Sequence, residues 1–367
     1  MTDQDYMRRA ISLAKNGIGR VNPNPLVGAV IVKDGRIIGE GYHARYGDLH
    51  AERAAIKNLT ESAEGATIYV TLEPCCHYGK QPPCTEAILE QKIARVVVGS
   101  RDPNPLVAGK GAAILREAGV VVEEDFLREE CDALNPVFFH FITTKRPYVR
   151  MKYAMTADGK IATRTGASKW ITGEAARGEV QRMRIACTGI MAGIGTVLAD
   201  DPMLNVRIEG ERSPIRIICD SSLRIPLDCQ LVKTVEQVPV IVACAYREED
   251  VSLQKKQKAL EEKGLLVWNL PNEEGKVDLP ELMRRLGERN IDSVLLEGGG
   301  ILNDSALRAG IVSEVNVFIA PKLFGGAEAK SPVEGMGVTL PAEAVMMQLD
   351  QVEQIGEDLL LRYRIRR

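Results

Sequence analysis

The chain has 367 residues, of which 45% are hydrophobic and 26% charged, and its formal net charge is −3. This length is enough for two hydrophobic cores, and the composition is typical of globular domains rather than of disordered or fibrous chains. The slightly acidic balance gives no support to a basic surface for nucleic acid or anionic membranes.

The N-terminal stretch MTDQDYMRRAISLAKNG is polar and amphipathic, and it lacks the apolar core of a signal peptide. No apolar run long enough to span a membrane occurs in the sequence. Three of the eight cysteines cluster at positions 75, 76 and 84, which indicates a metal site in a reducing compartment rather than a disulfide framework. We therefore expect a cytoplasmic protein without a nucleic-acid or membrane partner.

Apolar strands alternate with helices in the first part of the chain, which is typical of a layered α/β domain. Asp3 or Asp5 is expected to cap a first helix that ends near residue 17. Asp34-Gly35 is expected to form the turn of a hairpin. Strands are expected at 26–32, 36–42, 66–72, 95–99 and 120–123, and further helices at 50–59, 83–91 and 112–118.

The order His50-Ala51-Glu52, then Pro74-Cys75, then Cys84 is typical of zinc-dependent nucleobase deaminases. One histidine and two cysteines give zinc three protein ligands and leave a fourth position for water, as in catalytic zinc sites. The Glu52 carboxylate can carry protons between that water and a substrate. The sequence therefore predicts a catalytic zinc site with His50, Cys75 and Cys84 as ligands.

The cysteine spacing departs from the compact Cys-x-x-Cys pattern, because eight residues, CHYGKQPP, separate the two proposed ligands. His77 and Lys80 add cationic groups to this insert. Cys76 should face away from Cys75 in an extended chain, and Pro74 favours Cys75 as the ligand. A cluster of buried thiols with a surface histidine is the alternative, and each residue taken alone would favour it.

Asn22-Pro23-Asn24-Pro25 and Asp102-Pro103-Asn104-Pro105 place asparagines on loops stiffened by proline. Ordinary turns are the simpler interpretation of each motif taken alone. Beside a zinc site, however, a fixed amide offers donors and an acceptor to the edge of a pyrimidine.

We place a domain boundary in the segment 140–147, which shows no helical pattern, and so expect domains at 1–145 and 146–367. The second domain also alternates strands and helices. Its strands are expected at 148–155, 189–192, 215–219, 240–245, 293–296, 315–320 and 359–365, and its helices at 173–186, 253–263 and 302–308.

Three strand ends in the second domain carry residues that suit a nucleotide cofactor. Gly193-Ile194-Gly195-Thr196 and Glu297-Gly298-Gly299-Gly300 follow strands and can present backbone N–H groups to phosphate. Neither is a G-x-G-x-x-G fingerprint, and a tight turn or a helix contact explains each equally well. Ser222 and Arg224 suit the 2′-phosphate of NADP, with a surface turn as the alternative.

Over its whole length the chain resembles the bacterial family of bifunctional riboflavin-biosynthesis enzymes, which join a pyrimidine deaminase to a reductase. The resemblance rests on NPNPLVGAVIV, HAE, TLEPCCHYGKQPPC, DPNP, KYAMTADGKIA, SKWIT, AGIGTVLADDP and LLEGGG. It implies a cytidine-deaminase-like three-layer α/β/α sandwich followed by a dihydrofolate-reductase-like α/β domain. It also implies zinc and NADPH as cofactors, phosphorylated pyrimidines as substrates and a homo-oligomer.

The resemblance further implies individual roles. Glu52 would carry protons in deamination, and Lys152 and Asp200 would take part in reduction. Substrate contacts are implied for Asn24, His43, Ala51, His77, Lys80, Asp102 and Asn104, and in the second domain for Ser168, Arg184, Leu204, Arg207 and Glu297. Cofactor contacts are implied for Ala154, Trp170, Thr196, Asp200, Ser222, Gly298, Gly299, Gly300, Ile301, Leu302, Asn303, Asp304 and Ser305, to which the argument above adds Arg224.

Two other functions are compatible with parts of the sequence. A deaminase of tRNA or free cytidine would share the zinc motif, but the acidic net charge and Lys80 favour a small phosphorylated substrate. A nucleotide-binding regulator with structural zinc is the other alternative. The open fourth zinc position and Glu52 argue against it, and an assay for ammonia release would separate the two.

Overall fold

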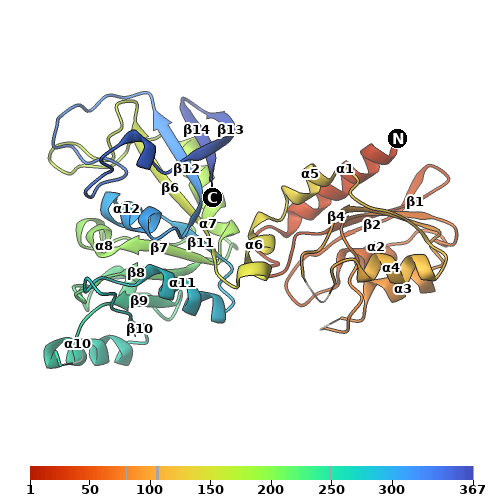
Figure 1. Cartoon of the computed structure of the whole chain (residues 1–367), viewed down its shortest axis with the longest axis horizontal. Coiled ribbons are helices and arrows are strands. Elements are labelled where there is room, and N and C mark those ends of the chain that lie inside the picture. The colour runs from red at the N-terminus through yellow and green to blue at the C-terminus, as the bar shows by residue number, and fades with distance from the viewer. Residues whose placement is uncertain (80, 105–106, 248, 367) are drawn as a thin grey trace. The chain divides into compact units, whose positions relative to one another are not determined.

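The computed structural model describes residues 1–79, 81–104, 107–247 and 249–366. The chain divides into two compact units, Met1–Lys145 and Arg146–Arg367, and each unit is built around its own sheet (Figure 1). In the described part of the chain, no helix has the length and apolar character needed to cross a membrane.

The first unit contains a five-stranded sheet in the order β2-β1-β3-β4-β5. The strands β2, β1 and β3 pair antiparallel, whereas β3, β4 and β5 pair parallel. Their bounds are Gly28–Lys33 (β1), Arg36–Tyr42 (β2), Thr67–Leu72 (β3), Arg95–Ser100 (β4) and Val121–Glu123 (β5). The parallel pairing places the carboxyl ends of β3 and β4 at the same edge of the sheet, where the chain turns into loops.

Helices cover both faces of this sheet. Alternate residues of β1 point to opposite faces, so Ala29 and Ile31 join one core and Val30 and Val32 the other. The first core also contains residues of α2, α3 and α4, and the second contains residues of α1 and α5. The helices are α1 (Asp3–Ala14), α2 (Ala51–Lys57), α3 (Cys84–Glu90), α4 (Lys110–Glu117), α5 (Arg128–Asp132) and α6 (Pro136–Thr144), with a 3₁₀ turn at Lys15–Gly17. The three-layer α/β/α sandwich is therefore confirmed.

The second unit contains a nine-stranded sheet in the order β10-β9-β8-β7-β11-β6-β12-β14-β13. The first seven strands in this order run parallel, and the β13–β14 hairpin adds antiparallel strands beside β12. Their bounds are Tyr148–Thr156 (β6), Gly189–Gly193 (β7), Ile215–Cys219 (β8), Val240–Cys244 (β9), Leu266–Asn269 (β10), Ser293–Leu296 (β11), Val312–Ala320 (β12), Met347–Ile355 (β13) and Asp358–Ile365 (β14).

Helices also pack on both faces of the nine-stranded sheet. On one face, α11 and α12 pack against β11 and β7, and on the other α7 packs against β11, β12 and β14 while α10 packs against β8 and β9. The helices are α7 (Glu174–Ala186), α8 (Ile194–Asp200), α9 (Gln230–Lys233), α10 (Val251–Glu262), α11 (Leu279–Glu288) and α12 (Gly300–Arg308), with a 3₁₀ turn at Pro341–Glu343. Because β8, β7, β11 and β6 are parallel neighbours, their carboxyl ends form one edge, where parallel α/β sheets bind ligands.

Several local expectations were wrong. Thr2, not Asp3 or Asp5, caps α1, and Asp5 completes the capping box by accepting from the Thr2 N–H. The segment 140–147 was expected to lack a helix, yet α6 extends to Thr144 because Pro136 can start a helix whose apolar side chains pack inward. The strand β13 and the helix α11 were not anticipated.

Candidate active sites

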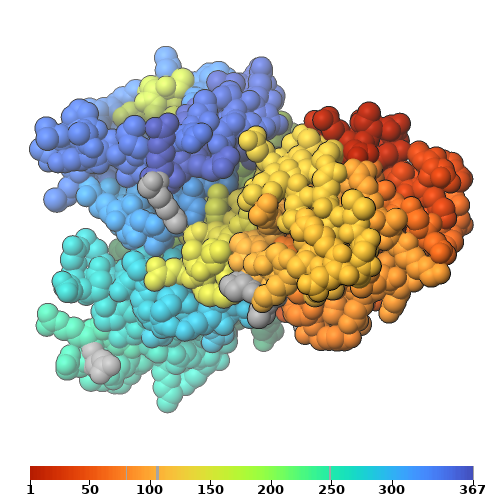
Figure 2. Space-filling view, turned by 45° about the vertical axis from the view of Figure 1, so that its right-hand side comes forward, coloured from red at the N-terminus to blue at the C-terminus, as the bar shows by residue number. Residues whose placement is uncertain are grey.

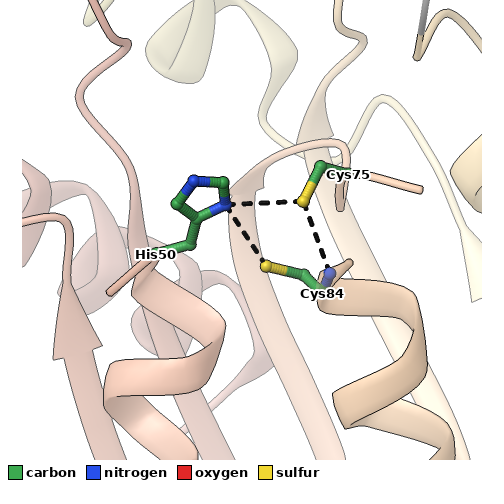
Figure 3. Close-up of side chains that lie close together, drawn as sticks. All are labelled: His50, Cys75 and Cys84. Carbon is green, nitrogen blue, oxygen red and sulfur yellow. Dashed lines mark hydrogen bonds between the residues drawn. The ribbon is translucent and has the colours of Figure 1, made fainter. Parts of the chain in front are cut away.

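Three side chains meet at the edge of the first sheet where β3 ends. His50 is the residue that caps the N-terminus of α2, Cys75 follows β3, and Cys84 is the first residue of α3. The His50 Nδ1 atom lies 3.4 Å from the Cys75 Sγ atom and 3.5 Å from the Cys84 Sγ atom (Figure 3). The backbone of Cys84 also donates a hydrogen bond to Cys75 Sγ at 3.4 Å. Two helix starts and one strand end therefore fix the positions of all three donor atoms.

These donors fit a zinc ion. Their ligand atoms all lie within 4.8 Å of one another. In tetrahedral zinc sites, with Zn–S of about 2.3 Å and Zn–N of about 2.0 Å, a nitrogen and a sulfur ligand stand roughly 3.6 Å apart. The N···S distances agree with that value, and imidazole plus thiolate is a donor set that suits zinc.

Glu52 lies in the first turn of α2, is only 4% exposed, and stands beside the three donors. Burial, followed by the nearby Cys75 thiolate, raises the pKa of Glu52 to about 7. A hydrogen bond from Cys84, with a further one from His50, lowers the pKa of Cys75. The site therefore combines a thiolate with a carboxyl group that can hold or accept a proton near neutral pH.

Buried His43 and partly buried Asn24 form a pair next to these donors. The His43 Nδ1 atom lies 3.0 Å from the Leu49 carbonyl oxygen, which can only accept, so Nδ1 carries the proton. The Asn24 Nδ2 group then donates to His43 Nε2 at 3.1 Å. Burial lowers the pKa of His43, which agrees with this neutral tautomer, and its ring meets the His50 ring edge to face at 5.6 Å. Two residues expected to bind substrate thus lie beside the metal ligands.

The remaining residues expected at the first site lie on the surrounding loops. Ala51 is buried at the first position of α2, and His77 lies between β3 and α3 with a buried Nδ1 atom that has no hydrogen-bond partner among the described residues. Asp102 follows β4 and accepts a hydrogen bond from the Asn104 backbone at 2.8 Å. Burial raises the pKa of Asp102 to about 6. Lys80 lies outside the described residues.

Arg53 is a residue of this site that the sequence analysis missed. Its guanidinium donates to the Pro82 carbonyl oxygen at 3.0 Å and to the Pro83 carbonyl oxygen at 2.8 Å. It thereby ties the end of the insert to α2, one residue from Glu52. No local signal could have shown this, because the contact joins residues about thirty positions apart.

In the second unit, Lys152, Arg184 and Glu297 form a charged cluster, in which Arg184 is buried and the other two side chains are partly buried. Arg184 donates two hydrogen bonds to the Glu297 carboxylate, at 2.7 and 3.0 Å, and a third to the Asn205 carbonyl oxygen at 2.7 Å. Burial lowers the pKa of Lys152. Burial by itself would raise the pKa of Glu297, but Arg184 and Lys152 hold it below its usual value. Three residues expected at the reductase site are therefore brought together from the middle of β6, the end of β11 and the last turn of α7.

Trp170 lies on the segment between β6 and α7 with 57% of its surface exposed. The Arg177 guanidinium stacks 4.7 Å from the centre of its ring, and Lys322 donates to the Trp170 and Ile171 carbonyl oxygens at 3.0 and 2.7 Å. Lys169 forms an ion pair with Asp200 at 3.2 Å. The sequence analysis missed Arg177 and Lys322, which hold this segment in place.

The residues expected to bind cofactor occupy neighbouring strand ends. Ser222 and Arg224 are exposed after β8, with the Arg224 Nε atom 4.0 Å from the Asp220 carboxylate. At the start of α12, Asn303 donates to the Pro332 carbonyl oxygen at 2.8 Å, and Asp304 pairs with Arg308 at 2.9 Å. Because the Asn303 and Asp304 side chains already bond to other residues of the chain, the start of α12 offers mainly its backbone N–H groups to a ligand.

The other residues expected at this site lie along the same edge of the sheet. They are Ala154 on β6, Ser168 before α7, Thr196 on α8, Leu204 and Arg207 after α8, Gly298 and Gly299 after β11, and Gly300, Ile301, Leu302 and Ser305 on α12. The Arg207 charge helps to lower the pKa of Glu297, after Arg184 and Lys152.

Two protein families match the two units. Residues 1–100 match the cytidine and deoxycytidylate deaminase zinc-binding region, and residues 147–361 match the RibD C-terminal domain. The chain is 56% identical to the riboflavin biosynthesis protein RibD of Actinobacillus pleuropneumoniae over 363 residues, covering 99% of this chain and 95% of that protein. It is 39% identical to the RibD of Escherichia coli K12, covering 98% of this chain and 99% of that protein.

Solved structures show the same similarity over the full length. Acinetobacter baumannii RibD, form 1, is 39% identical with a TM-score of 0.87, covering 100% of this chain and 99% of that one. A diaminohydroxyphosphoribosylaminopyrimidine deaminase/5-amino-6-(5-phosphoribosylamino)uracil reductase from Thermotoga maritima is 38% identical with a TM-score of 0.86, covering 99% of this chain and 98% of that one.

Removal of one thiol should release the metal. We expect Cys84→Ala to lower bound zinc from about one ion per chain to near zero, because two ligands hold zinc far less tightly than three. Cys76→Ala is the matched control and should keep its zinc. Elemental analysis of the purified variants checks this, and zinc lost from Cys76→Ala but kept in Cys84→Ala would contradict the ligand assignment.

Proposed function

The chain belongs to the family of the riboflavin biosynthesis protein RibD, and we propose that residues 1–145 carry its deaminase site and residues 146–367 its reductase site. It is a bifunctional enzyme of riboflavin biosynthesis that uses zinc and NADPH. The deaminase hydrolyses an amino group from a phosphoribosylated diaminopyrimidine. The reductase then converts the ribosyl group of the resulting aminouracil into a ribityl chain.

The observation that carries the deaminase proposal is the buried Glu52 beside the three donors His50, Cys75 and Cys84. His50, Cys75 and Cys84 would hold zinc, which would supply the Lewis acidity that makes a water molecule more acidic. Glu52 then accepts a proton from water and delivers one to the departing amine, because its buried carboxyl group lies beside the three donors. Ammonia leaves and the ring keeps the oxygen of the water.

Substrate recognition in the deaminase is proposed for the loops around Glu52. Asn24 and His43 hold each other in a fixed orientation, so their polar groups meet a pyrimidine without rearranging. Ala51, His77, Asp102 and Asn104 complete the proposed contacts. Lys80 is proposed to bind the substrate phosphate on the basis of its charge.

The reductase proposal rests on the charged cluster of Lys152, Arg184 and Glu297. NADPH supplies the hydride that reduces the ribose carbon C1′. Lys152 lies beside the reacting sugar, where burial makes its ammonium group more acidic than in water. Glu297 and Arg184 fix each other and contact substrate, together with Ser168, Leu204 and Arg207. Asp200 is proposed to act beside the cofactor.

NADPH is proposed to lie along the carboxyl ends of β8, β7, β11 and β6. The backbone from Gly298 to Ser305 meets its phosphates, and Trp170, Ala154 and Thr196 line its path. Ser222 and Arg224 receive the 2′-phosphate that distinguishes NADPH from NADH.

We also propose that the enzyme works in the cytoplasm and without nucleic acid. None of the eight described cysteines forms a disulfide, which fits a reducing compartment. The net charge of −3 offers no general attraction to a polyanion.

A homo-oligomer is proposed through the C-terminal part of the second unit. β13 is an edge strand, and Met347, Leu349 and Val352 on it are 37%, 51% and 55% exposed. The blue C-terminal segment forms part of the outer surface in Figure 2. An edge strand with exposed apolar side chains favours pairing with another chain, and a second copy presents a surface of the same kind.

The two activities should separate by mutation. Glu52→Gln is expected to keep its zinc, since Glu52 is not a ligand, and to lose deaminase rate by about 10²–10⁴-fold. It should still oxidise NADPH when given the deaminated substrate. Lys152→Met should instead release ammonia at the rate of the unmodified enzyme and lose NADPH oxidation with the deaminated substrate. The measurement is ammonia release and NADPH oxidation by each variant with both substrates, and a folded Glu52→Gln protein that cannot reduce deaminated substrate would refute two independent sites.

Cofactor choice should depend on Arg224. A charge-assisted contact is worth roughly 1.5–3 kcal/mol, so Arg224→Ala should lower the preference for NADPH over NADH by about 10- to 150-fold. Lys255→Ala, which removes an exposed cation from α10, should leave the preference unchanged. The kcat/KM ratio for the two cofactors tests this, and an unaltered ratio in Arg224→Ala would remove Arg224 from the cofactor site.

Charges placed on β13 should dissociate the oligomer. We expect the double variant Leu349→Lys, Val352→Lys to sediment as a monomer, because paired edge strands would bring like charges together. Leu266→Lys, on the opposite edge strand β10, is the control and should sediment like the unmodified protein. A monomeric unmodified protein would contradict the proposal.

A further inference from the structure

Glu73 lies between β3 and the ligand Cys75, and it is buried although it is neither a metal ligand nor a residue expected to touch substrate. Its carboxylate accepts hydrogen bonds from three backbone N–H groups, those of Gly109 at 3.0 Å, Gly111 at 3.1 Å and Ala112 at 3.4 Å. These groups belong to the start of α4, which lies 36 or more positions further along the chain. A carboxylate in such a position is stabilised by several charge-assisted bonds at once.

The first N–H groups of a helix usually bond to a side chain of a neighbouring residue. Those of α4 bond to Glu73 instead, which lies two positions before the metal ligand Cys75. The residue at the cap position is Gly109, which has a left-handed backbone (φ 78°) and no side chain that could accept a bond. A Ser, Asp or Asn at this position is the common local solution. The use of Glu73 instead ties the start of α4 to the residues that carry Cys75.

A second, independent contact brings the same two segments together. A Cβ atom on Gly111 would lie 2.1 Å from the Pro74 carbonyl oxygen, so only glycine allows this approach. The start of α4 thus packs directly on the peptide that joins Pro74 to the ligand Cys75.

Glu73 also holds the other end of the loop that joins β4 to α4. Its backbone N–H donates to the Ser100 carbonyl oxygen at 3.0 Å, where β4 ends. Asp102 and Asn104, which we propose to contact the substrate, lie two and four positions after Ser100. The backbone of Glu73 therefore bonds the residue at the start of this loop, and its carboxylate bonds the residues where the loop enters α4.

We propose that Glu73 is a positioning residue for deamination, which sets the distance between the metal ligand Cys75 and the substrate loop carrying Asp102 and Asn104. It acts through the loop and touches neither metal nor substrate. This inference rests on the proposed deaminase site and adds the residue that aligns its two halves.

Glu73→Gln is the test, because an amide keeps the shape of the side chain but turns an N–H₂ group toward backbone donors. We expect KM for the diaminopyrimidine substrate to rise by roughly 10-fold or more, since misplaced binding groups weaken substrate binding. Zinc per chain and reductase kinetics should stay unchanged. Glu117→Gln, at the exposed end of α4, is the matched control and should keep the KM of the unmodified enzyme.

Thermal unfolding separates positioning from stability alone. A lower Tm with unchanged KM and kcat at a temperature well below the transition would overturn the inference, and so would loss of zinc from a folded variant. If Glu73→Gln does not fold, Glu73→Asp replaces it, because it keeps the charge but is too short to reach all three donors.

An unmodified enzyme that releases no ammonia would instead refute the proposed function. An inactive Glu52→Gln variant together with a Glu73→Gln variant of normal KM would refute only the role of Glu73.

Discussion

Helix N-termini that meet acidic groups organise the deaminase unit. Glu52 lies in the first turn of α2, Cys75 accepts the first N–H group of α3, and Glu73 accepts the first N–H groups of α4, so three helices start at one edge of the sheet. Unpaired N–H groups at these starts favour anions, and the site supplies a thiolate and two carboxyl groups. The sheet faces supply the apolar contacts that keep these helices in register. The positions of the metal ligands thus depend on backbone N–H groups at the starts of these helices.

The reductase unit uses a different solution, a partly buried ion cluster. Arg184 and Glu297 form a bidentate ion pair with little exposed surface, and Lys152 lies close enough to interact with both charges. Removing charges from water costs free energy that only close pairing and further hydrogen bonds offset. The cluster contains two basic side chains, Lys152 and Arg184, and one carboxylate, Glu297. That balance favours an anionic ligand, which agrees with phosphorylated substrates.

The sequence analysis predicted what depends on residue type and local spacing. The HAE and PC motifs predict a catalytic zinc site from residue type and spacing, and the Asp34-Gly35 pair predicts the hairpin turn between β1 and β2. It missed α6, whose Phe-rich stretch lacks a clear polar face, and β13, whose residues are mostly polar or exposed.

Contacts between distant residues were not predictable in the same way. Arg53 binds carbonyl oxygens of the insert, and Lys322 binds those of Trp170 and Ile171 across about 150 positions. Such partners are set by the folded arrangement of the strands, and no single segment of the chain carries a signal for them.

The two clusters also differ in how much chain must be synthesised before each can form. His50 and Cys84 are separated by 34 positions, whereas Arg184 and Glu297 are separated by 113. Closing a longer loop costs more chain entropy and takes more time. The metal ligands can therefore gather early on the ribosome, and ion binding can stabilise that unit while β11 and the Glu297 that follows it are still being made.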